Sequence, residues 1–344
     1  MRISVVAASR EDDSAPTEAL AVARLADRLG YGEVWLGEGA TWDSFVLATA
    51  VGLTTERVAL TTGPVPVSVR DPATIARGAA NVEAVVGRPV GVALGTSSVR
   101  VVEGVHGRSR AGAAVVLGEV AEAVRPLVGP EAEPDWDVVP AHGFRRRLAP
   151  ASGPLTVAAF GDRAIAVAAR YADRMLLDLV SPDQVRELRA KLDAAVSERQ
   201  SPRGPGQPHG DQRQPGLAGG APGAPGRRPT LAAWLPAAVD PDERSLTQLA
   251  KSIVGYLTVR GYSGMFAAAG FGDAVELART GAGPDELLAA LPAEAAATVG
   301  LVGDLATVRT RLSEYEAAGL DEVAIVPATS GDPAGERTLT ALAA

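Results

Sequence analysis

The sequence predicts an α/β fold, a single (β/α)8 or TIM barrel that spans residues 1–344. One unit recurs along the chain: an amphipathic helix ends at a glycine, and a short apolar strand follows a few residues later. Residues 16–38 and 303–327 both have this form. Strands that are apolar throughout are typical of parallel sheets buried on both faces. Eight alternating units in this length favour a barrel, which carries its chemistry at the carboxyl ends of its strands.

The elements can be assigned in order along the chain. After Pro16, apolar residues recur at i, i+3, i+4 and i+7, which predicts a one-faced helix, and Gly30 suits the left-handed position beyond its end. Asp71 and Pro72 are typical of an N-cap and the first helical residue, so they predict the start of a third helix. We expect strands at 2–7, 33–37, 57–62, 89–95, 154–159, 174–178, 229–237 and 322–327.

Two segments exceed a minimal barrel. Residues 197–229 are rich in Gly and Pro, a composition that cannot bury enough apolar surface to offset the entropy of ordering. We expect a mobile insertion there, with an active-site lid as the alternative. Residues 240–300 predict an additional helical insertion. Its aromatic residues would shape a substrate pocket or a dimer contact, or they would simply pack a pair of helices onto the barrel.

Composition excludes several classes of function. The chain has no cysteine, so disulfides, thiolate nucleophiles, iron–sulfur clusters and cysteine zinc sites are absent. The three histidines, His106, His142 and His209, lack metal-ligand spacing, and we expect no metal site. The net charge of −8 argues against nucleic acid as a partner. No signal peptide or membrane-spanning run is evident, so we expect a cytoplasmic protein without membrane contact. With so few proton-transfer side chains, an enzyme of this composition would depend on an organic cofactor.

The strand ends resemble the luciferase-like monooxygenase superfamily, and most of all its oxidoreductases that use the deazaflavin coenzyme F420. The run Leu-Gly-Tyr-Gly-Glu-Val-Trp-Leu-Gly-Glu at 29–38 carries part of the resemblance. The order and spacing of the matching segments carry the rest, over nearly the whole chain apart from 197–229. The other segments are 50–63, 70–72, 89–95, 102–104, 155–161, 171–177 and 303–327.

The resemblance implies where a deazaflavin would bind. In such proteins a backbone bulge after the third strand supports one face of the ring, and here that place reads Thr62-Gly63-Pro64-Val65-Pro66. Two prolines that flank one residue restrict the backbone strongly. The alternative is an ordinary rigid connection between a strand and a helix. The resemblance therefore implies that Thr62, Gly63 and Pro64 contact the cofactor ring.

Two further strand ends are candidates for cofactor contacts. Thr96, Ser97 and Ser98 follow the fourth strand, and their hydroxyls would reach the ring or the phosphate tail, or would cap the next turn of backbone. A turn before a predicted helix offers free N–H groups to a phosphate. The resemblance places the cofactor phosphate at this turn, with Arg163 as its charge partner; the alternative is that Asp162 caps the helix. The residues of the turn are Ala159, Phe160, Gly161, Asp162 and Arg163.

Other polar and aromatic residues at strand ends are candidates for catalysis and substrate binding. Relatives commonly carry an acidic residue followed by histidine after the second strand, whereas this chain has Glu38 followed by Gly39. Glu38 is therefore the candidate catalytic residue, with a water or a purely structural role for Glu38 as the alternatives. We expect Trp42, Asp178 and Trp234 to contact the substrate or the ring.

The function that the sequence favours is hydride transfer between reduced coenzyme F420 and a small or medium organic substrate. A monooxygenase that depends on FMN is the alternative within the same fold. A degenerate member that binds a flavin without turnover is a third reading, because Gly39 replaces the usual histidine. The resemblance also implies a homodimer.

Overall fold

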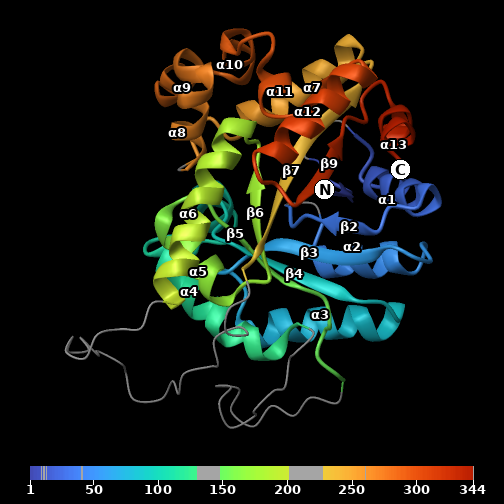
Figure 1. Ribbon diagram of the computed structural model, residues 1–344, viewed down its shortest axis with the longest axis vertical. Coiled ribbons are helices and arrows are strands. Elements are labelled where there is room, and N and C mark those ends of the chain that lie inside the picture. Colours follow the sequence, from blue (N-terminus) through green and yellow to red (C-terminus); the bar gives the residue numbers. More distant parts are fainter. Residues whose placement is uncertain are drawn as a thin grey trace.

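A parallel barrel of eight strands, covered by helices on its outside, forms the body of the protein (Figure 1). The computed structural model describes residues 1–8, 10, 12, 14–39, 42–129, 148–200, 228–259 and 261–343. The barrel runs in the order β1, β2, β3, β4, β5, β6, β7 and β9, and the pairing of β9 with β1 closes it. The predicted (β/α)8 fold is confirmed.

All eight predicted strands are present, and a short ninth strand joins them. β8 pairs only with the far end of β7, at Ala237 to Val239, so it lies outside the closed ring. β3 continues through the predicted bulge to Pro66, four residues beyond the expected end. The strands are β1 (Arg2–Val6), β2 (Glu33–Leu36), β3 (Ala59–Pro66), β4 (Val90–Gly95), β5 (Leu155–Ala158), β6 (Arg174–Asp178), β7 (Thr230–Val239), β8 (Leu301–Gly303) and β9 (Glu322–Pro327).

Helices connect the strands and cover the outer face of the barrel. Those that alternate with barrel strands are α1 (Glu18–Leu29), α2 (Ser44–Gly52), α3 (Pro72–Val86), α4 (Ala113–Val124), α5 (Asp162–Tyr171), α6 (Pro182–Gln200), α12 (Leu305–Ala317) and α13 (Glu336–Leu342). Helices α7 (Glu243–Val254), α8 (Tyr262–Phe266), α9 (Gly272–Arg279), α10 (Pro284–Ala290) and α11 (Ala295–Thr298) lie between β7 and β8. Shorter helical turns are η1 (Arg100–Val105), η2 (Arg125–Leu127), η3 (Ala267–Phe271) and η4 (Pro333–Gly335). None of the described helices is long and apolar enough to cross a membrane.

Local sequence signals explain where these helices begin and end. Gly30 follows α1 with a φ of 87°, the left-handed conformation that glycine adopts without steric cost. At α3 the Asp71 carboxylate accepts a hydrogen bond of 2.9 Å from the Thr74 N–H, and Pro72 is the first helical residue. Both predicted helix boundaries are confirmed.

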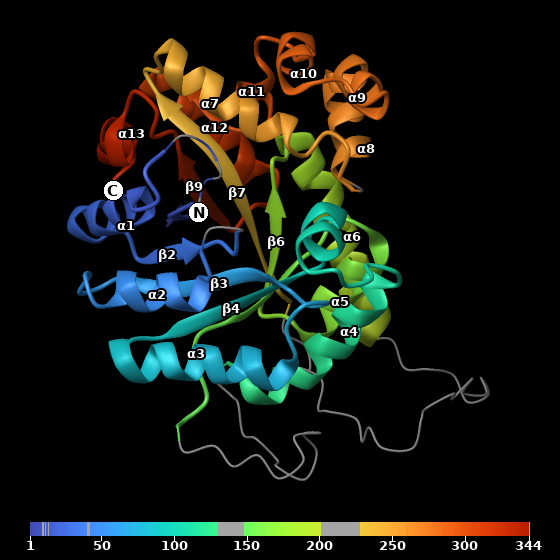
Figure 2. The ribbon, with the colours of Figure 1, turned by 180° about the vertical axis from the view of Figure 1, so that it is seen from behind.

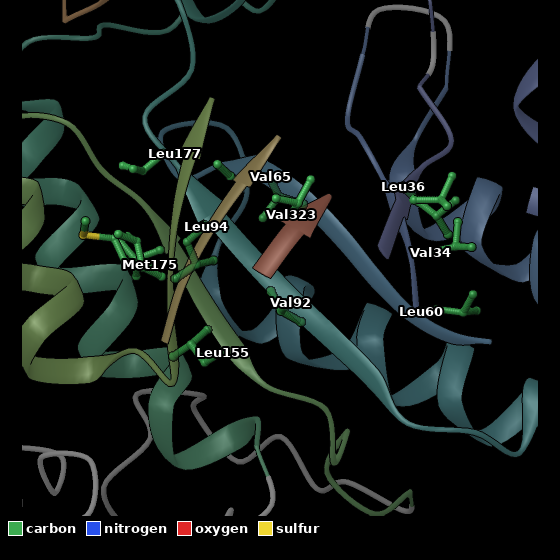
Figure 3. Packing of buried hydrophobic residues seen from close by; sticks show 14 of the residues in the cluster. Val34, Leu36, Leu60, Val65, Val92, Leu94, Leu155, Met175, Leu177 and Val323 are labelled. Carbon is green, nitrogen blue, oxygen red and sulfur yellow. The ribbon is translucent and has the colours of Figure 1, made fainter. Parts of the chain in front are cut away.

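The main core lies between the barrel and its helices. Because side chains alternate along a strand, one set points outward to the helices and the other into the barrel. Figure 3 shows the outward set, which is aliphatic apart from Met175 and comes from several neighbouring strands. The inward set toward the carboxyl ends is a smaller apolar layer built around Trp35, which is fully buried. The barrel interior is therefore filled with side chains.

The opposite, amino-terminal end of the interior holds a buried ionic network. Arg174 of β6 pairs with Glu33 at 2.8 Å and with Glu322 at 2.9 Å, and it is 2% exposed. Its guanidinium also lies over the Trp35 ring, 3.9 Å from the centroid. Burial acts to raise the pKa of Glu33, but the hydrogen bond and charge of Arg174 outweigh it and the pKa is lowered. The network closes this end of the barrel with fully paired charges.

The second predicted insertion is helical, and it has a core of its own. Helices α7 to α11 bury a cluster that includes Phe266 and Phe271, together with Leu179 and Ala328 from strand-end loops of the barrel. Figure 2 shows these helices as a group at one end of the molecule, with α8 beside the tip of β6. Of the first predicted insertion, residues 197–200 belong to α6, and residues 201–227 lie outside the described part.

Candidate functional site

The bulge predicted after the third strand lies within β3. The register between β3 and β4 shifts between Thr62 and Val65, and the peptide bond from Gly63 to Pro64 is cis. Thr62 is fully buried, and its hydroxyl donates to the Gly91 carbonyl at 3.2 Å. Its side chain therefore contributes to β3–β4 pairing, and only the backbone of the bulge is left to support a ligand.

Two glycines allow the strands to pack closely at this bulge. A Cβ atom on Gly63 would lie 2.4 Å from the Ala93 carbonyl oxygen, and Gly63 has a φ of 97°. A Cβ atom on Gly95, at the end of β4, would lie 2.9 Å from the Cβ of Pro64. Neither position accommodates a larger residue without displacing the bulge. The two strands thus present a backbone surface at the carboxyl end of the barrel.

The hydroxyl residues after β4 are held by Arg110, which the sequence did not single out. Its Nε donates to the Ser97 carbonyl at 2.7 Å, and a terminal nitrogen donates to the Thr96 hydroxyl at 3.1 Å. Ser97 has a φ of 55°, an uncommon conformation for a residue other than glycine. The Ser98 hydroxyl accepts from the Val101 N–H at 3.3 Å, so Ser98 makes the capping contact that was the alternative reading.

The turn after β5 leads directly into α5. Gly161 occupies the cap position with extended backbone and Asp162 is the first helical residue, so the suggestion that Asp162 caps this helix is wrong. No side chain caps the helix. Gly161, Asp162 and Arg163 are exposed, and a Cβ atom on Gly161 would have no neighbour within 4 Å. The first N–H groups of α5 are therefore not taken by a capping side chain, as an anion site at a helix N-terminus requires.

Glu38 takes part in an ionic cluster beyond β2. Its Oε1 accepts from the Arg70 Nε at 3.0 Å, and its Oε2 accepts from the Ser44 N–H at 2.9 Å. Arg70 also pairs with Asp43, the N-cap of α2. Burial acts to raise the pKa of Asp43, but Arg70 and the helix N–H groups lower it. Both oxygens of Glu38 are thus engaged, and its catalytic role stays a prediction.

Asp178 is the last residue of β6, and Tyr262 of the helical insertion reaches it. The Tyr262 hydroxyl donates to the Asp178 Oδ2 at 3.0 Å. Burial raises the pKa of Asp178 to about 7, although the bonds from Tyr262 and the Leu179 N–H act to lower it. Burial and the nearby Asp178 charge raise the pKa of Tyr262 well above its ordinary value. A carboxyl with a pKa near neutrality can both give and accept a proton.

Two tryptophans lie at or near the strand tips. Trp234 is the register partner of Asp178 on β7, and its ring packs edge-on against Trp35 with 6.0 Å between centroids. The Trp234 Nε1 is buried and has no hydrogen-bond partner among the described residues. Trp42 is different, because its Nε1 donates to the Pro16 carbonyl at 2.9 Å. The structure therefore brings Trp234 next to Asp178, while the indole N–H of Trp42 is already bonded.

Phe160 connects the turn after β5 with the helical insertion. Its ring packs edge-on against Tyr262 with 4.7 Å between centroids, and Tyr256 lies 4.7 Å from Tyr262 on another side. The aromatics of 240–300 thus contribute both to the site, through Tyr262, and to the separate helical core, through Phe266. The sequence pattern showed these aromatics, but it could not indicate which of them face the strand tips.

A cavity of about 510 Å³ lies at the rim of this end of the barrel, between the loops after β1 and β9 and helix α7. Its charged lining has both signs: Asp12, Glu18 and Glu243 are acidic, and Arg244 and Lys251 are basic.

In the described part of the chain, no group of three histidine, aspartate or glutamate side chains is arranged to hold a metal ion.

Solved structures with the same fold include enzymes with two kinds of cofactor. The F420-dependent tetrahydromethanopterin reductase from Methanopyrus kandleri gives a TM-score of 0.70 at 15% identity, over 99% of this chain and 96% of that one. An F420-dependent secondary alcohol dehydrogenase, in complex with an F420-acetone adduct, gives 0.68 at 14% identity, over 99% and 98% of the two chains. The oxygenating constituent of 3,6-diketocamphane monooxygenase from Pseudomonas putida, in complex with FMN, gives 0.62 at 14% identity, over 100% and 96%.

The sequence comparison identifies the family directly. No protein of curated function matches the sequence at a significant level. The sequence model of the luciferase-like monooxygenase family, however, matches residues 1–322, which is nearly the whole barrel. The chain therefore belongs to the luciferase-like monooxygenase family.

Proposed function

We propose that this protein is an oxidoreductase that uses coenzyme F420 and transfers a hydride between the deazaflavin and a small or medium organic substrate. The observation that carries the proposal is the compact bulge of Gly63 and Pro64 packed against Gly95 at the carboxyl ends of β3 and β4. A planar ring needs a compact surface of this kind, and a larger residue at either glycine would displace the bulge that forms it. Trp234, with its unpartnered buried N–H, lies at the same end of the barrel.

The other strand ends would hold the rest of the cofactor. The uncapped N-terminus of α5 offers N–H groups and a favourable dipole to a phosphate, and Arg163 offers a positive charge beside them. Thr96 and Ser97, fixed by Arg110, would contact the ring or the tail. When bound, the deazaflavin supplies or accepts a hydride. The chain itself would bind and orient the two reactants and exclude water.

Structural relatives with the same fold include enzymes that use the deazaflavin. The two F420-dependent enzymes give TM-scores of 0.70 and 0.68, against 0.62 for the monooxygenase solved with FMN. The FMN-dependent monooxygenase remains the second candidate, because it shares the fold over 100% of this chain. The two candidates differ in a measurable way: a reduced flavin in such an enzyme reacts with oxygen, whereas hydride transfer from a deazaflavin proceeds without it.

The test is a comparison of the two cofactors on the purified protein. We expect F420 to bind more tightly than FMN in a fluorescence titration and to raise the melting temperature more. At 100 times its Kd a ligand adds about 2.7 kcal/mol of stability. Tighter binding of FMN would refute the proposal in favour of the monooxygenase. Binding of a cofactor without oxidation or reduction by any substrate would favour the non-catalytic reading.

The phosphate position is tested by one variant and its matched control. Arg163→Ala should weaken F420 binding by about 1–3 kcal/mol, the value of a hydrogen bond to a charged group. Arg170→Ala changes the same kind of residue on the same helix, but at the opposite end, where Arg170 lies over the Tyr171 ring. Its affinity should match that of the wild type. If the wild type and both variants bind F420 with equal affinity, the phosphate binds at another strand end.

A further inference from the structure

A group of side chains lies at the tip of β6, apart from the candidate catalytic residue Glu38. Asp178 and Trp234 are register partners on neighbouring parallel strands, so their side chains leave the sheet on the same face. Trp234 is an inward residue of the apolar layer around Trp35, and Asp178 follows two residues after the inward Leu176. Both side chains therefore belong to the inner side of the barrel at its carboxyl end.

Tyr262 fixes the carboxyl group of Asp178 from the helical insertion. Its hydroxyl donates to the Oδ2 at 3.0 Å, and the Tyr262 ring itself packs against Phe160 and against Tyr256, each with a centroid distance of 4.7 Å. Since Tyr262 donates to Oδ2, a proton on Asp178 is carried by Oδ1. Within the described residues, Tyr262 is the titratable side chain bonded to this carboxyl, Tyr256 packs against the Tyr262 ring, and no basic side chain is paired with Asp178.

The backbone after Asp178 couples it to the insertion. Leu179 has a φ of 53°, which is costly for a branched residue and is sustained only by its surroundings. Its side chain is buried in the core of the helical insertion, while its N–H donates to the Trp234 carbonyl at 3.2 Å. Strained backbone of this kind gathers at functional sites, and here it directly follows the last residue of β6.

We propose that Asp178 is the residue that exchanges a proton with the substrate, that Tyr262 positions its carboxyl group, and that the Trp234 N–H binds the same substrate oxygen. This assignment rests on the proposed hydride transfer and names the substrate class: a carbonyl compound or the alcohol that corresponds to it. A protonated Asp178 and the indole N–H are two donors, and two donors suit a carbonyl oxygen, which has two lone pairs.

The proton and electron balance follows from these roles. In the direction of reduction, the carbonyl carbon gains the hydride that the reduced cofactor supplies, and the π electrons of the C=O bond move to oxygen. The oxygen takes the proton from Asp178, which is left as a carboxylate and regains a proton from water. In the direction of oxidation, the Asp178 carboxylate accepts the hydroxyl proton while the carbon loses its hydride to the oxidised cofactor.

The first experiment needs no cofactor. In protein labelled with carbon-13 aspartate, the Asp178 carboxyl signal is assigned by its loss in Asp178→Asn and is followed against pH. Burial should place its midpoint at about 7. Tyr262→Phe should move the midpoint upward, because the lost hydrogen bond acts to lower the pKa. A midpoint near the ordinary value of about 4, or one that Tyr262→Phe leaves unchanged, would overturn the assignment.

The second experiment measures oxidation of reduced F420 by acetone, cyclohexanone and benzaldehyde over a range of pH. Asp178→Asn should lower kcat by about 10²- to 10⁴-fold, the usual contribution of a general acid. In Tyr262→Phe the loss of activity at alkaline pH should move upward with the midpoint measured by NMR. Trp234→Phe, which lacks the N–H, should raise KM by about two- to tenfold. Asp183→Asn, on the exposed start of α6, is the matched control and should leave all values unchanged.

The outcomes separate this inference from the proposed function. If FMN binds and F420 does not, the proposed function fails, and the NMR titration still decides whether Asp178 is held as a proton donor. If a carbonyl compound oxidises reduced F420 but Asp178→Asn keeps the rate and the pH profile of the wild type, the inference alone fails. If F420 binds and none of the three carbonyl compounds oxidises it, the assigned substrate class is refuted.

Discussion

Asp178 imposes a cost on the folded protein that can be measured as a dependence of stability on pH. Burial raises the pKa of its carboxyl from 3.8 to about 7, a difference of about three pH units. One unit corresponds to about 1.4 kcal/mol, so ionised Asp178 destabilises the native state by at most about 4 kcal/mol. Asp178→Asn replaces the carboxyl by a neutral group of the same shape whose oxygen still accepts from Tyr262. The variant therefore resembles the wild type with Asp178 protonated.

The sign of the effect is fixed by which state holds the proton more tightly. The folded protein binds this proton more tightly than the unfolded chain, so the stabilising contribution is complete below pH 4 and is lost as pH rises through about 7. The free energy of unfolding of Asp178→Asn should therefore exceed that of the wild type increasingly with pH. The advantage should grow by about 2–3 kcal/mol between pH 5 and pH 8.5 and change little above that.

Urea unfolding of the two proteins at a series of pH values is the assay. Asp183→Asn serves as the control, because this aspartate is exposed and its curve should run parallel to that of the wild type. A constant difference between Asp178→Asn and the wild type from pH 5 to pH 8.5 would refute the reasoning. It would mean that Asp178 titrates alike in the folded and unfolded states.

Two more predictions concern the ends of the barrel. Arg174→Met should cost about 3–5 kcal/mol in urea unfolding, because it leaves Glu33 without its ion-pair partner and leaves the buried Glu322 with only the exposed Arg2. Replacing both glutamates by glutamine in the same protein should restore part of the loss, and no loss in the single variant would show that the network is not needed. Gly95→Val should abolish binding of F420 while circular dichroism shows that the protein stays folded, because the new Cβ would lie 2.9 Å from the Cβ of Pro64. The control is Gly104→Ala, whose Cβ would meet no atom within 4 Å. Unchanged affinity in both variants would contradict the proposed ring position.

The fold could be predicted because its signals are local. Apolar strands, glycines after helices and the Asp71-Pro72 start each depend on a few adjacent residues, and all were found where the sequence placed them. β8 was missed because three residues that pair only with the extension of β7 produce no periodic pattern. The extension of β3 to Pro66 was missed for a related reason: a strand with a bulge and two prolines does not look like a strand in sequence.

The candidate site could be predicted only in part, because its pairings join distant segments. Asp178 and Trp234 stood out as polar or aromatic residues at strand ends. That Tyr262 would reach Asp178 across 84 positions, or that Arg70 would occupy Glu38 across 32, has no local signal. Burial was the other missing quantity, since the raised pKa of Asp178 depends on how the helical insertion packs above it.

The ionic network at the amino-terminal end has a consequence for the order of molecular events. Arg174 and the ring of Trp35 fill the amino-terminal part of the barrel interior, so no ligand can pass through the barrel from that end. Every molecule that reaches Asp178 arrives from one side and departs by the same route. Product must leave before the next substrate enters. A bulky compound bound above the strand tips would therefore block both substrate entry and product release. Inhibitors of this kind should compete with substrate and also slow product escape.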